Sequence, residues 1–136
     1  MKIKEKSSYM KKLVFYKCPT CGNVVVKLVD KRVPVVCCGA PMKELTPNTV
    51  DAAEEKHVPV VNINGNVVNV EIGSVEHPMI EAHYITHIVI ETNLGHYVRV
   101  LNPNDKPSAT YYLAEGETVE TVYEYCNLHG LWSVTL

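Results

Sequence analysis

Several features are scarce in this 136-residue chain, and each absence removes a class of protein. No apolar run approaches the roughly 20 residues that a membrane-spanning helix needs. The charged segment 1–12 lacks the apolar stretch of a signal peptide, so we expect it to be a flexible tail. The net charge is only −2, and no basic block indicates nucleic-acid binding. We therefore expect a cytoplasmic protein with neither a membrane nor a nucleic acid as partner.

Helical periodicity is scarce as well, because valine, isoleucine, threonine and tyrosine dominate, as is typical of strands. One helical turn is expected over 51–56, capped by Thr49 or Asp51. Before it, strands are expected over 13–17, 24–29 and 33–36. After it, turns at Asn64-Gly65 and at 93–95 help to separate about seven strands, over 58–63, 67–72, 83–92, 97–101, 109–113, 118–125 and 131–135.

This pattern predicts an all-β protein of two domains. Seven short antiparallel strands in about 85 residues are typical of an immunoglobulin-like β-sandwich. Two prolines in 41–48 indicate an irregular linker. We therefore expect a small cysteine-rich domain over 13–47 and a sandwich domain over 48–136.

The cysteines divide into a group of four and a single one, and thiols in a chain without an export signal favour metal or redox chemistry. Cys18 and Cys21 lie in C-P-T-C-G, and Cys37 and Cys38 lie in C-C-G. Two close pairs of thiolates fit a tetrahedral site for zinc or iron. Adjacent cysteines reach one metal only if the backbone turns between them. The alternative is two disulfides or four unrelated thiols.

A second group of potential ligands comes from three distant segments, 55–59, 77–83 and 126–130, with the sequences E-K-H-V-P, H-P-M-I-E-A-H and C-N-L-H-G. They supply four histidines and one cysteine: His57, His77, His83, His129 and Cys126. All lie at expected strand ends or in loops, which gather at the ends of a sandwich. His87 and His96 lack such a context, and we interpret them as ordinary strand or surface residues.

Four neutral imidazoles and one thiolate favour a five-coordinate metal with one open position. A thiolate opposite that position would donate electron density towards a bound substrate. Lys56 adds positive charge beside His57, so the site should attract a small anion. A blue-copper electron carrier is the alternative suggested by C-x-x-H, but no methionine follows His129. A zinc-binding module without catalysis is a third possibility.

Together these motifs resemble the desulfoferrodoxin family. The resemblance rests on C-P-T-C-G, C-C-G-A-P-M, E-K-H-V-P, G-S-V-E-H-P-M and C-N-L-H-G, and it runs from about Tyr16 to Ser133. About ten residues at the N-terminus precede the family's usual start. The resemblance implies a rubredoxin-like or desulforedoxin-like domain with one non-haem iron, held by Cys18, Cys21, Cys37 and Cys38. It also implies a second iron in the immunoglobulin-like domain, with His57, His77, His83 and His129 around it and Cys126 as axial ligand.

The same resemblance implies the activity of a superoxide reductase, which converts superoxide to hydrogen peroxide with one electron and two protons. Glu55 and Lys56 match the pair that flanks the open position in the family. Lys56 would steer superoxide, and Glu55 would cap the oxidised iron. A rubredoxin-like or other small protein would donate the electrons, and the chain would form a homodimer. The alternative is an electron-transfer metalloprotein without catalysis.

Overall fold

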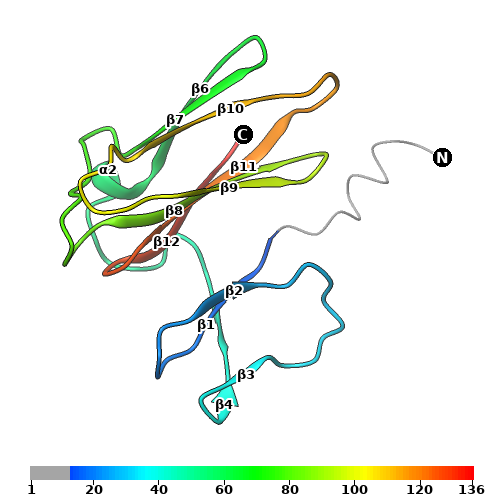
Figure 1. Ribbon diagram of the computed structural model, residues 1–136, viewed down its shortest axis with the longest axis vertical. Coiled ribbons are helices and arrows are strands. Elements are labelled where there is room, and N and C mark those ends of the chain that lie inside the picture. Colours follow the sequence, from blue (N-terminus) through cyan, green and yellow to red (C-terminus); the bar gives the residue numbers. More distant parts are fainter. Residues whose placement is uncertain (1–12) are drawn as a thin grey trace. The chain divides into compact units, whose positions relative to one another are not determined.

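The computed structural model describes residues 13–136, and the tail predicted over 1–12 lies outside this range. The chain forms two compact units, which divide between Thr46 and Pro47. The regular structure of both units is almost entirely antiparallel strand, as the composition predicts (Figure 1). No helix among the described residues is long and apolar enough to cross a membrane.

The first unit contains two small sheets. In one, β1 (Phe15–Lys17) lies between β2 (Val24–Val26) and β5 (Lys43–Leu45). In the other, β3 (Val36–Cys37) pairs with β4 (Ala40–Pro41). The prediction of an irregular linker over 41–48 is therefore wrong for residues 43–45. They form a strand because β1 has a second free edge, where their backbone groups find partners.

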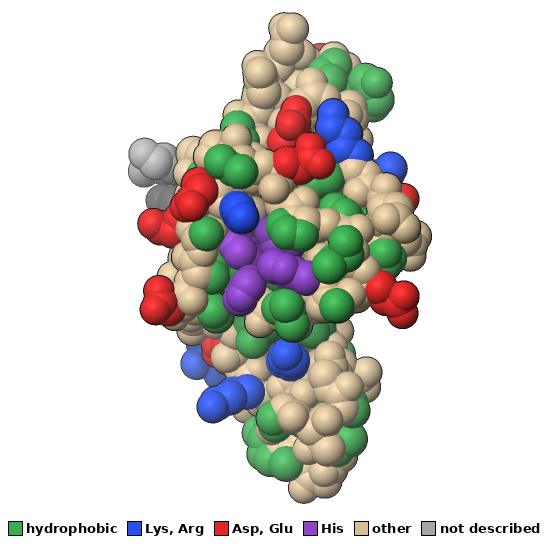
Figure 2. Space-filling view, turned by 90° about the vertical axis from the view of Figure 1, so that its left-hand side faces the viewer, with side chains coloured by type: hydrophobic (Ala, Val, Ile, Leu, Met, Phe, Trp, Pro, Cys, Tyr) green, Lys and Arg blue, Asp and Glu red, His purple; other side chains and the backbone are tan. Residues whose placement is uncertain are grey.

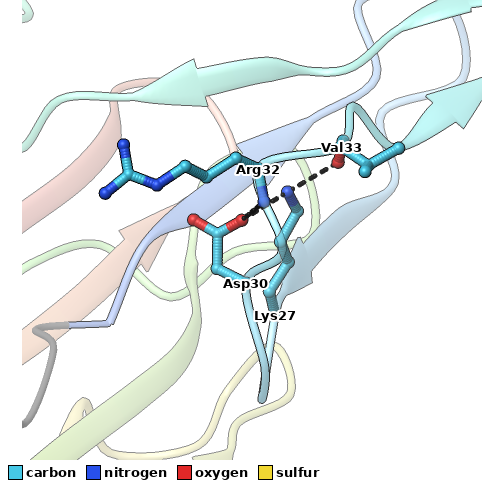
Figure 3. A network of polar contacts seen from close by, with 4 residues as sticks. All are labelled: Lys27, Asp30, Arg32 and Val33. Carbon is cyan, nitrogen blue, oxygen red and sulfur yellow. Dashed lines mark hydrogen bonds and ion pairs between the residues drawn. The ribbon is translucent and has the colours of Figure 1, made fainter.

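The strands predicted over 24–29 and 33–36 are shorter than expected, because a polar network holds most of the segment between them as a loop (Figure 3). The Lys27 ammonium donates to Asp30 Oδ1 at 3.0 Å and to the carbonyl of Val33 at 2.8 Å. The amide of Arg32, a residue with φ of 61°, donates to the same Asp30 oxygen at 2.7 Å. The loop thus returns the chain to β3, which carries Cys37.

The second unit is a β-sandwich of a three-stranded and a four-stranded sheet, with the orders β10-β7-β6 and β12-β11-β8-β9. Its core consists of aliphatic side chains such as Val70, Ile88 and Val122. The seven strands are β6 (Pro59–Asn64), β7 (Val67–Ile72), β8 (Ile85–Thr92), β9 (His96–Val100), β10 (Ser108–Tyr112), β11 (Val119–Cys126) and β12 (Gly130–Thr135). The predicted all-β fold is confirmed.

Two local predictions need correction. The first hairpin turns at Gly65-Asn66, not at Asn64-Gly65, because Asn64 pairs with Val67. A positive φ at Gly65 alone fits a turn whose first central residue is glycine. The single helical turn, α2, spans Glu54–His57, and Ala53 precedes it without a side-chain cap. Neither Thr49 nor Asp51 therefore caps it.

The strand ends next to the ligand segments meet at one end of the sandwich. This end contains the starts of β6, β8 and β12 and the ends of β7 and β11, because neighbouring strands run antiparallel. The three segments that contain the predicted histidine and cysteine ligands lie next to these strand ends. The fold therefore gathers residues that are up to 72 positions apart in the sequence.

Candidate metal centres

The four cysteines of the first unit form a tight sulfur cluster. Their four Sγ atoms lie within 4.8 Å of one another, and none of these cysteines forms a disulfide. Cys21 Sγ and Cys37 Sγ are 3.6 Å apart. If this sulfur–sulfur distance is the edge of a regular tetrahedron, division by 1.63 places the centre about 2.2 Å from each sulfur. This is close to a metal–thiolate bond of ~2.3 Å. The cluster therefore fits a single tetrahedral metal ion.

The backbone around the sulfurs explains how neighbouring cysteines converge. Cys38 and Gly39 both have positive φ, at 53° and 77°, so the chain reverses directly after Cys37. The amide of Cys21 donates to Cys18 Sγ at 3.4 Å and lowers the pKa of that thiol to about 6. The predicted turn between the adjacent cysteines is confirmed. The sulfur cluster favours the thiolate at Cys18 alone, because hydrogen bonds with Cys21 raise the pKa of Cys37 and of Cys38.

At the end of the sandwich, four imidazole rings form a square. The planes of neighbouring rings are inclined at 81–82° to each other, and their centroids are 4.7–4.9 Å apart. The opposite rings of His57 and His83 are 6.4 Å apart and inclined by only 28°. The His57 Nε2 atom lies 3.2 Å from His77 Nε2 and 3.1 Å from His129 Nδ1. If these nitrogen–nitrogen distances are the edges of a square, division by √2 places its centre about 2.2 Å from each nitrogen. This is near a metal–imidazole bond of ~2.0–2.1 Å.

Hydrogen bonds on the outer side of two rings fix their tautomers. His57 Nδ1 donates to the carbonyl of Ala53 at 2.8 Å, and His77 Nδ1 donates to that of Pro78 at 2.7 Å. Burial lowers the pKa of both, that of His77 to about 4, so both are neutral at pH 7. Their Nε2 lone pairs then face each other without a proton between them. A cation at the centre satisfies this arrangement, and a hydrogen bond does not.

Cys126 and His83 complete the donor set. Ligand atoms of His57, His83, Cys126 and His129 lie within 4.8 Å of one another, and the His83 Nε2 atom is buried with no hydrogen-bond partner. Cys126 is fully buried at the end of β11, and its sulfur accepts the amide of His129 at 3.4 Å. The structure thus brings together all five residues that the sequence singled out here.

A buried carboxyl group lies beside the Cys126 thiol. Glu124 is fully buried two residues before Cys126, and neither of its oxygens has a hydrogen-bond partner among residues 13–136. Burial raises the pKa of this carboxyl to about 9, so it is neutral at pH 7. Glu124 therefore adds no negative charge next to the sulfur at that pH.

Glu55 and Lys56 lie on α2, directly before His57, and both are exposed. Within the described part of the chain, neither side chain forms a hydrogen bond or an ion pair. After burial and the charge of His129, the charge of Lys56 is a further cause that lowers the pKa of His83. The ammonium thus acts on the site without being neutralised by a partner.

The histidine site reaches the surface on one side. Figure 2 shows the histidine side chains as one patch with a basic side chain beside it and hydrophobic side chains around it. His57 and His77 are buried, whereas His83 and His129 are partly exposed. A small anion can therefore approach the square from solvent, while its far side is closed by the core that contains Cys126.

Comparison with known proteins accounts for both centres. The desulfoferrodoxin profile matches residues 49–135, and the profile of the desulfoferrodoxin N-terminal domain matches residues 10–45. The chain belongs to the desulfoferrodoxin family. It is 50% identical to the desulfoferrodoxin of Syntrophotalea carbinolica over 122 residues, which cover 90% of this chain and 95% of that protein. The family carries two iron centres, in agreement with the two donor sets.

Solved structures agree with this family. The superoxide reductase from Treponema pallidum is similar with a TM-score of 0.77 and 34% identity, and the match covers 92% of this chain and all of that one. The superoxide reductase from Giardia intestinalis matches with a TM-score of 0.52 and 32% identity, over 60% of this chain and 97% of that one. The predicted family and fold are thereby confirmed.

Sequence reasoning missed several residues that hold the site together. Trp132 stacks on His57 with centroids 4.9 Å apart, and its Nε1 donates to the carbonyl of His129. Gly73 and Asn127 also hold the loops that carry ligands. Gly73 donates its amide to the carbonyl of Val58, and the side chain of Asn127 bonds to the backbone next to His83. A glycine directly after a strand and an asparagine between two ligand positions were the available signals. The sequence alone does not show which loop either residue contacts.

Proposed function

We infer that the chain is a superoxide reductase. The observation that supports this most strongly is the square of imidazoles, which combines with a buried cysteine sulfur in a member of the desulfoferrodoxin family. The overall reaction is superoxide plus one electron and two protons to hydrogen peroxide. An anionic substrate suits a site beside the Lys56 ammonium, which has no ion-pair partner among residues 13–136.

Two non-haem irons serve this reaction. Cys18, Cys21, Cys37 and Cys38 would hold the first, and His57, His77, His83, His129 and Cys126 would hold the second. Iron at the second site supplies a one-electron couple and a Lewis acid when it is bound. The protein fixes the rings of His57 and His77 from outside, places the Cys126 sulfur on the buried side and leaves the other side open to solvent.

We assign Lys56 and Glu55 to the open side. The Lys56 ammonium attracts superoxide and can donate a hydrogen bond to it. Glu55 carries the opposite charge and does not favour capture. Its role follows turnover, when it would cap the oxidised site until an electron arrives.

The electron donor and the assembly are part of the same proposal. A rubredoxin-like or other small carrier supplies the electrons, and the chain works as a homodimer in the cytoplasm. Support comes from the family resemblance and from the exposed apolar side chains of the first unit, among them Leu28 and Val29. Sedimentation of the purified protein measures the oligomeric state directly.

Kinetics of Lys56→Ala and Glu55→Ala test the proposal. We expect Lys56→Ala to slow the second-order reaction of the reduced protein with superoxide by roughly tenfold at low salt, and to flatten its dependence on ionic strength. Glu55→Ala should leave capture nearly unchanged and alter the ferric spectrum. Stopped-flow absorbance at several salt concentrations measures both.

Metal analysis provides the control. Purified protein should carry about two irons per chain and little zinc or copper. An iron-loaded protein that does not consume superoxide would be an electron-transfer metalloprotein instead. Equal slowing by the two variants would contradict the roles given to Glu55 and Lys56.

A further inference from the structure

The four histidines of the square are held in different ways. The rings of His57 and His77 are each fixed by a hydrogen bond to a backbone carbonyl. The backbone of His129 is fixed on both sides, because its amide contacts Cys126 Sγ and its carbonyl accepts the Trp132 Nε1–H. Among residues 13–136, the ring of His83 has no such bond to a carbonyl. Its position must come from its backbone.

The backbone of His83 lies near the end of the loop 73–84 between β7 and β8. Ile80 and His83 exchange two hydrogen bonds, Ile80 N to His83 O at 3.1 Å and His83 N to Ile80 O at 2.9 Å. This bridge shapes the turn, but both of its residues belong to the same loop. It does not fix the loop relative to Cys126 and His129.

Asn127 supplies that connection. Its Oδ1 accepts the amide of Tyr84 at 2.9 Å, and its Nδ2 donates to the carbonyl of Ala82 at 3.1 Å. Its own amide donates to the carbonyl of Tyr84 at 3.2 Å. The three bonds thus hold the residues on both sides of His83. They originate from the residue that directly follows Cys126.

We propose that Asn127 is a positioning residue, which holds the His83 imidazole at the fourth corner of the square relative to Cys126 and His129. It contacts neither substrate nor metal and acts through the backbone on both sides of one ligand. Groups that orient metal ligands from outside usually change metal affinity by about 10- to 100-fold when they are removed. Asn127 should therefore determine how long iron stays in the site.

Asn93 provides a matched control in the same sandwich. Its Nδ2 donates to the carbonyl of Gly116 at 2.9 Å, and its Oδ1 accepts the amide of Thr118 at 2.8 Å. It is half-buried, as Asn127 is. Asn93 directly follows β8, whereas His83 lies two residues before it, so this eight-residue strand, roughly 25 Å long, lies between the two positions.

The test measures iron release, with iron-loaded protein and a ferrous chelator in excess. We expect Asn127→Ala to release the iron of the histidine site roughly tenfold faster than the unchanged protein. Asn93→Ala should lower the denaturation temperature about as much as Asn127→Ala does, but it should leave the rate of iron release unchanged. The electron paramagnetic resonance spectrum of the ferric site should change in Asn127→Ala alone, because it reports the symmetry of the ligands.

Asn127→Asp separates positioning from simple loss of folding. It keeps the acceptor for the Tyr84 amide but replaces the donor to the Ala82 carbonyl, so release should lie between those of the unchanged protein and Asn127→Ala. Release within twofold of the unchanged protein in Asn127→Ala, or equal release in Asn93→Ala, would overturn the inference. Although the inference rests on the proposed iron site, no superoxide is used. Failure here is therefore distinct from failure of the reductase activity.

Discussion

At the scale of single residues, buried acids show how the sandwich treats charge away from the metal. The Glu117 carboxylate accepts three different donors: Thr92 Oγ1 at 2.6 Å, the amide of Ala114 at 2.9 Å and the hydroxyl of Tyr111 at 3.2 Å. The bond from Thr92 is the largest cause that lowers the pKa of Glu117 below its usual 4.5. This acid thus joins β8 to the turn before β11.

Glu117→Gln should therefore lower the stability of the sandwich in a pH-dependent way. The folded protein binds the proton of Glu117 less readily than the unfolded chain, so this contribution is present above about pH 4.5. It is lost as the pH falls through the lower pKa of the folded state. The difference in denaturation temperature between Glu117→Gln and the unchanged protein should be largest near neutral pH and narrow in acid.

Glu115→Gln is the matched control, because Glu115 is exposed in the same turn. Calorimetry of all three proteins from pH 7 to pH 3 provides the measurement. Loss of iron in acid affects each of them alike and cancels in the differences. A Glu117→Gln difference that is independent of pH would contradict the assignment of this stability to an ionised carboxylate.

At the scale of elements, the loop after β7 holds α2 in place. The carbonyl of Glu55 accepts the amide of Val75 at 2.9 Å and the hydroxyl of Ser74 at 3.3 Å. Gly73 has a φ of 83°, and a Cβ there would lie 2.4 Å from the Val75 carbonyl and 2.8 Å from that of Glu55. The backbone of Gly73 can approach that of α2 so closely only because glycine has no Cβ. This contact fixes the position of α2 and thereby the positions of its side chains.

We expect Gly73→Ala to displace α2 and to disturb capture of superoxide. The clash involves backbone atoms, which cannot rotate away, so overpacking should cost about 1–3 kcal/mol of stability. The reaction with superoxide should slow together with that loss, because Lys56 moves with the helical turn. Chemical denaturation and stopped-flow absorbance measure the two effects.

Gly116→Ala separates the clash from backbone strain. Gly116 has a similar φ of 78°, but a Cβ there would meet no atom within 4 Å. This variant should lose some stability through strain alone and capture superoxide at the normal rate. Slow capture in Gly116→Ala would mean that general loss of stability, and not displacement of α2, explains the effect.

Sequence patterns predicted the strands of the sandwich better than those of the first unit. Alternation of buried and exposed residues indicates β7, and a high content of β-branched residues indicates β8, because both strands contribute to the core. β5 was missed, because its residues K-E-L carry little pattern and pair only through the free edge of β1. The side-chain cap predicted for α2 was wrong. This turn is held by tertiary contacts to Val75 and Ser74, so it needs no capping side chain.

At the scale of the whole molecule, each unit carries a complete set of ligands, and no ligand is shared between the two sets. The motifs, together with the family resemblance, predicted which residues meet. Their square arrangement and the tautomers of His57 and His77 were not predictable, because they depend on carbonyls whose positions only the fold defines.

The two sets should accordingly be separable. Replacing Cys18 and Cys21 together by serine should remove the first iron, and the iron content should fall from about two to about one per chain. The reduced protein should still react with superoxide when electrons are supplied chemically. Metal analysis and stopped-flow absorbance check both statements, and loss of both irons would contradict the independence of the units.

The facing lone pairs of His57 and His77 have a consequence for the choice of metal in the cell. A square of preorganised nitrogens with one sulfur does not discriminate strongly in favour of iron, because divalent copper binds such donors more tightly than ferrous iron does. The supply of metals during folding then decides which ion is bound. Protein that is produced with abundant copper and little iron should contain the wrong ion in a correctly folded sandwich.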